Sequence, residues 1–236
     1  MKTFIETFDN GPCGWIGWDG AVGPTPVEIH DGVATSRSPW WVDVNHAPPG
    51  AGYLHILFAL HTRHGPGFSK AVLDAGGPNS YVKGGYPTDL TNARITVRIK
   101  GDMKMRGSQL VLLAQGNVPT ATNPKNWVNQ VLIAQPLIVT PQWTDQTIQL
   151  VPDQKEWVNL GSRHDRLETY GKAPISDLLR DVNGDIIFVL FPIDVQSLKP
   201  VAGDPHKLRA GDDYEVDRSR LPDGHVMFDE VRIEFQ

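Results

Sequence analysis

The chain of 236 residues has one cysteine, Cys13. A single thiol excludes an intramolecular disulfide and a zinc site built from several thiolates. Positive charge is not in excess either, because the formal net charge is −5 and the basic residues form no dense run. Surfaces that bind nucleic acid usually carry a basic patch, so we expect no nucleic-acid partner.

Long apolar runs are also missing. No run is long enough to span a bilayer, so no membrane association is expected. The first residues lack the unbroken apolar core and small-residue cleavage site of a signal peptide, because Glu6 and Asp9 interrupt them. As written, the protein is expected to be cytoplasmic; a secreted form would require that a leader had been removed.

Common catalytic signatures are absent. The sequence contains no Gly-x-Ser-x-Gly elbow, no phosphate-binding loop, no dinucleotide fingerprint and no His-Glu-x-x-His pair. A Ser-His-Asp triad stays open, because its members can come from distant positions. No organic cofactor is expected, and the sequence does not specify an oligomeric state.

Glycine and proline punctuate many short apolar runs. The 23 glycines and 19 prolines make about 18% of the chain, against an average of about 12%. Runs of this kind predict strands joined by turns. The predicted strands are Lys2–Phe8, Pro26–His30, Gly32–Ser36, Trp40–Val44, Tyr53–Thr62, Ala93–Lys100, Ser108–Gln115, Val128–Val139, Thr144–Val151, Asp185–Asp194 and Val226–Phe235.

Helical signal is scarce, and the best case is Pro174–Asp181, where proline occupies a first turn. Ala93–Lys100 alternates apolar with polar residues, whereas Asp185–Asp194 is almost continuously apolar and predicts a central strand covered on both faces. Strands of both kinds predict an all-β fold, a two-sheet antiparallel β-sandwich. We expect a jelly roll with long loops and little helix, forming one domain over residues 1–236.

The most informative stretch for function runs from Trp40 to His61. If the strand from Tyr53 alternates regularly, Leu54, Ile56, Phe58 and Leu60 share one face. Tyr53, His55 and His61 then share the other face. The loop before them holds His46 and two expected ligand-binding residues, Asp43 and Asn45. Histidine and tyrosine suit proton transfer, so a catalytic cleft is one interpretation. The alternative is a solvated outer face, with His46 capping a loop.

A second polar cluster lies in residues 160–171. It contains Arg163, His164, Arg166 and Tyr170, together with Asp165 and Glu168. Loops on rigid sheets often carry functional groups, and arginine binds carboxylates through paired hydrogen bonds. The alternative is a salt-bridge cluster that fixes a long connection.

Tryptophan is the third feature, with seven residues in the chain. Aromatic faces stack on the apolar faces of sugar rings. Most of the seven are expected in the core. Trp40 and Trp41 are adjacent, so on a strand they face opposite sides, and one of them, together with Trp18, is expected to contact a ligand.

The two ends of the chain share a pattern that lies in Thr7–Gly11, Gly14–Trp18, Gly32–Thr35 and Val226–Phe235. These segments resemble jelly-roll carbohydrate-binding modules of the galactose-binding-like β-sandwich type. The resemblance implies a saccharide ligand and a structural calcium ion at Asp9 and Asp229. Regular alternation also places Asp229 on the apolar face of the last strand, where calcium, an arginine or a bulge would resolve its burial.

Together these features favour a carbohydrate-active enzyme, and a lyase that acts on a uronic sugar by β-elimination is preferred. Arg163 or Arg166 would bind the sugar carboxylate. A histidine (His46, His55 or His164) would be the base, and a tyrosine (Tyr53 or Tyr170) the acid. A hydrolase using Asp43 with Asp165 or Glu168 is the other enzymatic interpretation. A non-catalytic carbohydrate-binding module and a structural subunit of a larger assembly remain as alternatives.

Overall fold

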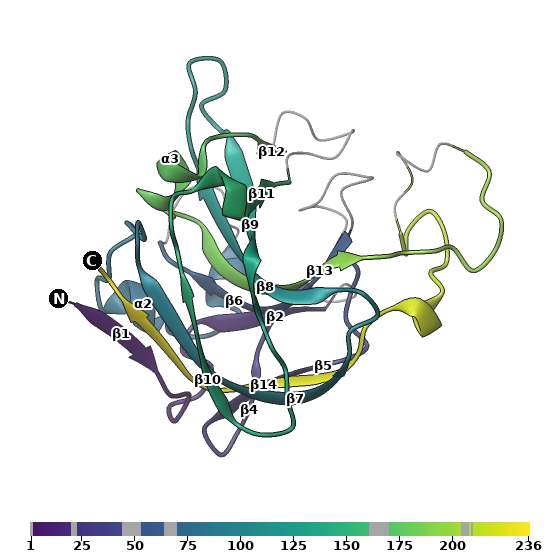
Figure 1. The fold of residues 1–236 in the computed structure, drawn as a ribbon, viewed down its shortest axis with the longest axis horizontal. Coiled ribbons are helices and arrows are strands. Elements are labelled where there is room, and N and C mark those ends of the chain that lie inside the picture. The colour runs from purple at the N-terminus through teal and green to yellow at the C-terminus, as the bar shows by residue number, and fades with distance from the viewer. Residues whose placement is uncertain are drawn as a thin grey trace.

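A computed structural model of the chain describes residues 2–19, 23–43, 53–63, 70–160, 170–203, 208 and 210–236. Within these residues the strands form two sheets, of six and eight strands, that pack against each other (Figure 1). Neighbouring strands are antiparallel, except for one short parallel pair between β12 (Tyr170–Gly171) and β9 (Trp127–Leu137). The predicted all-β sandwich is confirmed, whereas the jelly-roll topology stays a prediction.

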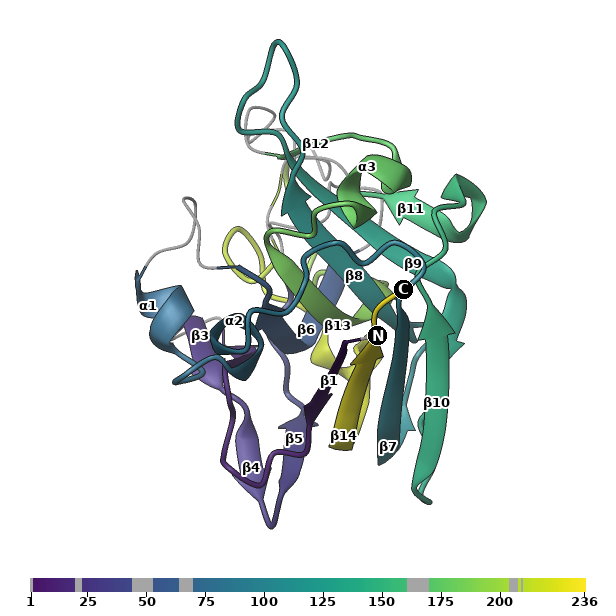
Figure 2. The ribbon, with the colours of Figure 1, turned by 90° about the vertical axis from the view of Figure 1, so that its left-hand side faces the viewer.

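The six-stranded sheet is built around the last strand, β14 (Asp223–Glu234). One edge of β14 pairs with β7, and the other pairs with β5 near its start and with β1 near its end. Figure 2 shows β1, β14, β7 and β10 side by side. The other strands of this sheet are β10 (Thr144–Gln149), β7 (Arg94–Lys104), β5 (Val33–Arg37), β4 (Glu28–His30) and β1 (Thr3–Glu6).

The eight-stranded sheet has β13 (Asp185–Ile193) near its centre, between β8 and β6. Every residue of β13 except Pro192 is buried. This confirms the prediction of a central strand covered on both faces. The remaining strands, besides β9 and β12, are β11 (Trp157–Asn159), β8 (Gln109–Asn117), β6 (Tyr53–His61), β2 (Trp15–Asp19) and β3 (Gly23–Pro26).

Two hydrophobic clusters cover the two faces of the eight-stranded sheet. The larger lies between the sheets, where Phe188 of β13 and Phe228 of β14 meet at 5.0 Å between ring centroids. The smaller lies on the outer face, where Ile187 and Val189 are buried and Val72 of helix α1 (Lys70–Asp74) packs against the cluster. Alternate residues of β13 therefore serve different cores, which explains its unbroken apolar sequence.

A β-bulge in β6 overturns the predicted alternation of this strand. Phe188 pairs with Phe58 and Val189 pairs with Ile56, so Leu57 is an extra residue on β6. Side chains before and after a bulge change faces. Leu54 and Ile56 consequently pack in the outer cluster and Phe58 packs between the sheets, whereas the sequence pattern placed all three on one face.

A second bulge, in β14, moves Asp229 off the apolar face. Phe228 pairs with Ile99 and Glu230 pairs with Arg98, which leaves Asp229 as the extra residue. Its side chain is 41% exposed, so the prediction that it lies among the apolar residues of the last strand is wrong.

Most predicted strands form, with two corrections near the N-terminus. The predicted strand Pro26–His30 is divided, because β3 ends at Pro26 in one sheet and β4 begins at Glu28 in the other. Of the predicted strand Trp40–Val44, Trp40–Asp43 is described, and it contributes one isolated bridge, from Asp43 to Leu54. The predicted helix forms as α3 (Ile175–Leu179), with Pro174 at its N-cap.

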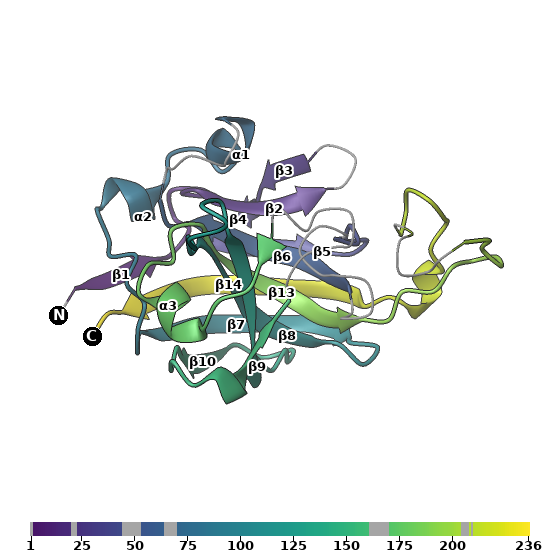
Figure 3. The same ribbon diagram turned by 90° about the horizontal axis from the view of Figure 1, so that it is seen from above.

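The short elements missed by the sequence patterns are β2, β11, β12, α1, α2 (Ser80–Lys83), η1 (Gln154–Glu156) and η2 (Arg218–Arg220). None of the described helices is long and apolar enough to cross a membrane. Seen from above, the described parts of the connection between β13 and β14 extend beyond the sheets, at the end opposite the two termini (Figure 3).

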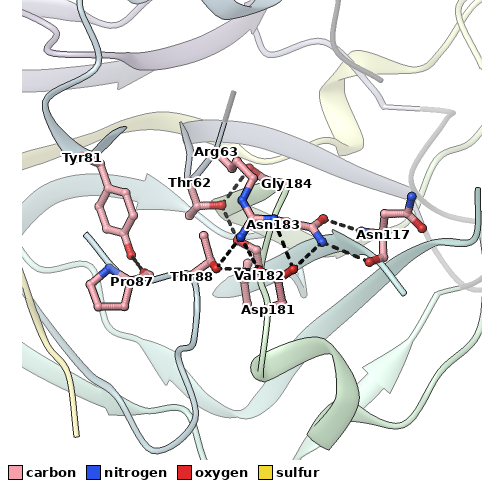
Figure 4. Close-up of polar contacts among 10 residues, drawn as sticks. All are labelled: Thr62, Arg63, Tyr81, Pro87, Thr88, Asn117, Asp181, Val182, Asn183 and Gly184. Atoms are coloured by element: carbon pink, nitrogen blue, oxygen red, sulfur yellow. Dashed lines mark hydrogen bonds and ion pairs between the residues drawn. The ribbon is translucent and has the colours of Figure 1, made fainter. Parts of the chain in front are cut away.

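At the start of β13, a network of polar side chains links four segments of the chain (Figure 4). The Thr62 hydroxyl donates to the carbonyls of Val182 and Gly184, and Arg63 and Thr88 both contact Asp181. Asn183 continues this network to the end of β8. Its side-chain oxygen accepts from Asn117 N at 2.7 Å, and its Nδ2 donates to Asn117 O at 3.1 Å. These bonds fix the turn before β13 against the end of β8.

Replacement of Asn183 by alanine is expected to lower the free energy of unfolding by about 1–3 kcal/mol. The Asn117 amide would lose its partner in a partly buried position. Urea denaturation of the variant measures the loss. The matched control is Asn123→Ala, in an exposed turn, for which about 0.5 kcal/mol or less is expected. Equal losses in the two variants would contradict the importance of this network.

Candidate functional site

The candidate site forms where the chain crosses from β5 in one sheet to β6 in the other. The described part of this crossover is Ser38–Asp43, and it is tied down at both ends. Ser38 N donates to Gly224 O at 2.9 Å, and Asp43 N donates to Leu54 O at 2.8 Å. Trp40 and Trp41 lie between these anchors, so rigid strands of both sheets hold them.

Three cavities meet at these tryptophans. Their volumes are about 460, 460 and 390 Å³. Trp41 lines the first and second, Trp40 lines the first and third, and Arg218 of η2 lines all three. We call the three cavities together the tryptophan groove. Its volumes lie in the range of small-ligand sites.

The first cavity has an aromatic wall. Trp18 of β2 and Trp41 are both partly exposed, and their rings lie 6.0 Å apart between centroids with an interplanar angle of 32°. Trp40 is only 6% exposed, and its Nε1 donates to the Ser36 hydroxyl at 2.9 Å. Of the two adjacent tryptophans, Trp41 therefore offers the more accessible ring to a ligand.

His55 of β6 lines the third cavity and is 1% exposed. Its ring lies 5.7 Å from the ring of Trp40. Nδ1 donates to the Trp41 carbonyl oxygen at 2.7 Å, and Nε2 has no hydrogen-bond partner among the described residues. Burial lowers the pKa of His55 to about 4; Arg218 acts in the same direction, and the Trp41 carbonyl and Asp43 oppose it. The imidazole is therefore neutral at pH 7, with Nε2 as an unprotonated acceptor.

Charged side chains complete the groove. Arg218 and Arg106 are exposed, and neither forms an ion pair or side-chain hydrogen bond with a described residue. Arg37, on the first cavity, is paired with Glu28 at 3.0 Å. The pKa of Asp223 is lowered chiefly by the hydrogen bond from the Ser38 hydroxyl, and the nearby cations Lys104 and Arg106 add to the effect.

The other described candidates occupy more interior positions. Asp43 is 1% exposed, and it lies close enough to His55 to influence its pKa. Tyr53 is partly buried against the core between the sheets and is hydrogen-bonded to Tyr214, whose pKa is raised by burial and by this contact. Tyr53 is not among the described residues that line the groove.

Several sequence candidates lie outside the described residues. These are Asn45, His46, Arg163, His164, Asp165, Arg166 and Glu168. The backbone of Tyr170 is described as part of β12, but its side chain is not. The roles assigned to these residues stay predictions.

His61 lies on the opposite face of β6 from His55, which corrects the prediction that the two share a face. His61 is 2% exposed; its Nδ1 contacts the Asp185 carboxylate, and its Nε2 lies 3.3 Å from Val72 O of α1. Burial alone would lower the pKa of His61, but the charge and hydrogen bond of Asp185, with the Val72 carbonyl, leave it raised. Both nitrogens face acceptors, which favours the protonated form and gives this histidine a structural position.

The carboxylates proposed for calcium already have other partners. Asp229 is paired with Arg98 Nε at 2.9 Å, and Asp9 accepts a hydrogen bond from Thr7 at 2.6 Å. Within the described ranges, no group of three or more His, Cys, Asp or Glu side chains is arranged to hold a metal ion. Asp229 is partly exposed and already paired with arginine, and calcium binding here stays a prediction from the resemblance alone.

Comparisons with known proteins return little. No protein-family model and no curated protein matches the chain. Among solved structures, one match comes from work on endo-acting O-glycanases that prominent members of the human gut microbiota express to initiate mucin breakdown. It is 13% identical, the alignment covers 98% of each chain, and the TM-score is 0.38. A TM-score this low carries neither a fold nor an activity over to this chain.

Sequence reasoning missed Arg106 and Arg218. Arg106 lies in the turn between β7 and β8, with a φ of 52°, and Arg218 begins η2. The turn residue Gly107 and the N-cap Asp217 signal local turns, but neither indicates a shared cavity. The fold brings the two arginines together from positions more than a hundred residues apart.

Proposed function

We propose that this is a carbohydrate-active protein that holds a glycan in the tryptophan groove. The observation that carries the proposal is the Trp18–Trp41 wall beside cavities lined by arginines. The apolar face of a sugar ring stacks on indole, while its hydroxyl groups need polar partners at the ring edge.

The groove offers both kinds of contact. Trp41 lines two of the cavities, so a chain of sugar rings can extend from one to the next past the same indole. Glu28 and Arg37 lie along the first cavity, and Asp212 and Glu215 along the second. Carboxylates and guanidinium groups are the usual acceptors and donors for sugar hydroxyls.

Replacement of Trp41 by alanine is expected to weaken glycan binding at least tenfold, because large aromatic residues dominate the binding energy of such sites. A panel of neutral and acidic oligosaccharides would be screened, and the best ligand titrated by calorimetry. The matched control is Trp143→Ala. Trp143 is also partly exposed, but it packs against Lys100 at 4.6 Å and does not line the groove. Equal affinities of the two variants would contradict the proposal.

Cleavage of the bound glycan is a second proposed function, favoured by the neutral His55 imidazole on the third cavity. We favour β-elimination from a uronic sugar. A base takes the proton from the carbon beside the carboxylate, and the electron pair of the broken C–H bond forms the carbon–carbon double bond. The bond from the next carbon to the glycosidic oxygen breaks, and that oxygen departs with a proton from an acid. His55 remains a candidate base. Asp223 is the described carboxylate on the third cavity, and its lowered pKa is the reverse of what the general acid of a hydrolase needs.

Product masses distinguish the two reactions. Hydrolysis adds one water to the summed mass of the products, whereas elimination conserves the mass and creates a double bond that absorbs ultraviolet light. We expect uronic oligosaccharides to yield unsaturated products, and expect less product from His55→Asn. Products that contain added water would replace the lyase with a hydrolase, and intact substrates would leave glycan binding alone.

A further inference from the structure

We infer that the third cavity of the groove is a subsite for a uronic acid residue, with Arg106 and Arg218 binding its carboxylate and His55 Nε2 accepting a hydrogen bond from one of its hydroxyl groups. This inference rests on the proposed glycan-binding function and names the class of sugar. The cavity of about 390 Å³ lies among the Ser38–Trp40 turn, the β7–β8 turn, η2 and the first residue of β14.

The first argument concerns charge. Arg106 and Arg218 line the cavity from separate elements, and neither is neutralised by a described carboxylate through an ion pair. Asp223 also lines the cavity, but Ser38 donates to its carboxylate. With two guanidinium groups and one carboxylate, the lining carries an excess of positive charge. The guanidinium group of arginine is planar, and it matches the geometry of a carboxylate better than any other cationic side-chain group.

Arg218 also links this cavity to the aromatic part of the groove, because it lines the two other cavities as well. Trp40 lines both the first and the third cavity, so the two cavities are neighbours. A glycan stacked on Trp41 can therefore place an adjoining ring in the third cavity. In that arrangement Arg218 contacts the rings on both sides.

The second argument concerns His55. Its side chain is 1% exposed, it lines the cavity, and its Nε2 has no partner among the described residues. Nδ1 is fixed as the donor to the Trp41 carbonyl, which leaves Nε2 as an acceptor. An unpaired buried acceptor is costly, and a ligand that brings a hydroxyl donor removes the cost.

A carboxylate and a neighbouring hydroxyl group together describe a uronic acid. A neutral sugar supplies hydrogens but no negative charge for the arginines. Sulfate, or phosphate as a dianion, supplies charge but no hydrogen for Nε2. A uronic acid ring carries its carboxylate next to carbons that bear hydrogen and hydroxyl groups, so one residue satisfies both arginines and the imidazole.

The test compares uronic oligosaccharides with the same oligosaccharides after chemical reduction of their carboxyl groups. Galacturonate, glucuronate and mannuronate oligomers would be titrated by calorimetry into the wild type, Arg218→Gln and Arg106→Gln. The matched control is Arg220→Gln. Arg220 lies in the same short helix as Arg218, but it faces Asp194 at 3.7 Å and does not line the third cavity.

We expect the wild type to prefer at least one acidic oligomer over its reduced form by at least tenfold. In each cavity arginine variant the tenfold preference for the acidic oligomer should disappear, because a charge-assisted hydrogen bond is lost. The affinity for the reduced form should stay within about twofold. Arg220→Gln should behave as the wild type, and the preference should shrink as salt is added.

The remaining outcomes separate this inference from the proposed function. If acidic and reduced oligomers bind equally, and the cavity variants change neither, the uronic acid subsite is wrong while glycan binding stands. If Arg220→Gln removes the preference as strongly as Arg218→Gln does, the effect is long-range charge and the subsite is also wrong. If no oligomer of either kind binds the wild type, both proposals fail together.

Discussion

Replacement of Asp185 by alanine is expected to lower the free energy of unfolding by about 3–5 kcal/mol at pH 6. Breaking a buried ion pair by removing one partner leaves an uncompensated charge in a site that water does not reach. Asp185 is 5% exposed and faces His61, which is 2% exposed, so neither charge has solvent as an alternative partner. The second nitrogen of His61 contacts the Val72 carbonyl, so the change also affects the attachment of α1.

The pH dependence of this pair has a definite sign. The pKa of His61 in the folded protein is raised above its ordinary value. Its contribution to stability is therefore complete below about pH 6.5 and is lost as the pH rises through the folded-state pKa. We expect the wild type to lose stability on the alkaline side and Asp185→Ala to lack that loss.

Urea denaturation at a series of pH values measures both effects. The matched control is Asp177→Ala, which removes an exposed pair with Arg180 at 3.0 Å on α3. That variant should change stability by about 1 kcal/mol or less at every pH. A loss in Asp185→Ala no larger than in the control would mean that the buried pair contributes little.

The second large effect concerns His55 and acts on the acid side. As the pH falls from about 6.5 to 4, the wild type is expected to lose about 3 kcal/mol of stability through this residue alone. The unfolded chain takes up a proton with an ordinary pKa near 6.5, whereas burial holds the pKa of the folded state at about 4. Stability from a depressed pKa is present above the unfolded value and is lost as the pH falls through the folded one.

His55→Asn isolates this contribution. An asparagine amide can keep the donor to the Trp41 carbonyl, and it does not titrate. Carboxylates protonate in both proteins, so the difference between the two denaturation curves reports the histidine. Parallel loss of stability in the wild type and the variant between pH 7 and pH 4 would show that His55 is not held neutral by burial.

His55 and His61 show which feature of this fold could not be predicted from the sequence. Both are on β6, and regular alternation placed them together on a face that lines a cleft. The bulge at Leu57 places them on opposite faces, one beside Trp40 and the other beside Asp185. A bulge is set by packing between strands, and its position has no signal in the alternation of one strand.

The features that sequence patterns predicted well depend on local periodicity. The all-β class, the alternation of Ala93–Lys100 and the buried central strand follow from side-chain spacing, and the structure confirms them. The division of Pro26–His30 between two sheets depends on pairing with distant strands. No property of the segment itself reveals it.

The candidate site was predicted only in part. Tryptophan content and the Trp40–Trp41 pair indicated an aromatic surface, and the structure places Trp41 and Trp18 together on one cavity. Arg106 and Arg218 belong to turns far apart in sequence, and only the packing of the two sheets brings them to one cavity. Such convergence cannot be read from spacing.

The central claim is that a glycan lies in the tryptophan groove, and a crystal structure with a bound oligosaccharide tests it most directly. The oligomer with the highest affinity in the binding screen would be used. We predict a sugar ring stacked on Trp41 and an adjoining ring within hydrogen-bond distance of Arg218. A glycan seated on another surface, such as the exposed side of Trp143, or no bound glycan at a saturating concentration, would contradict the claim.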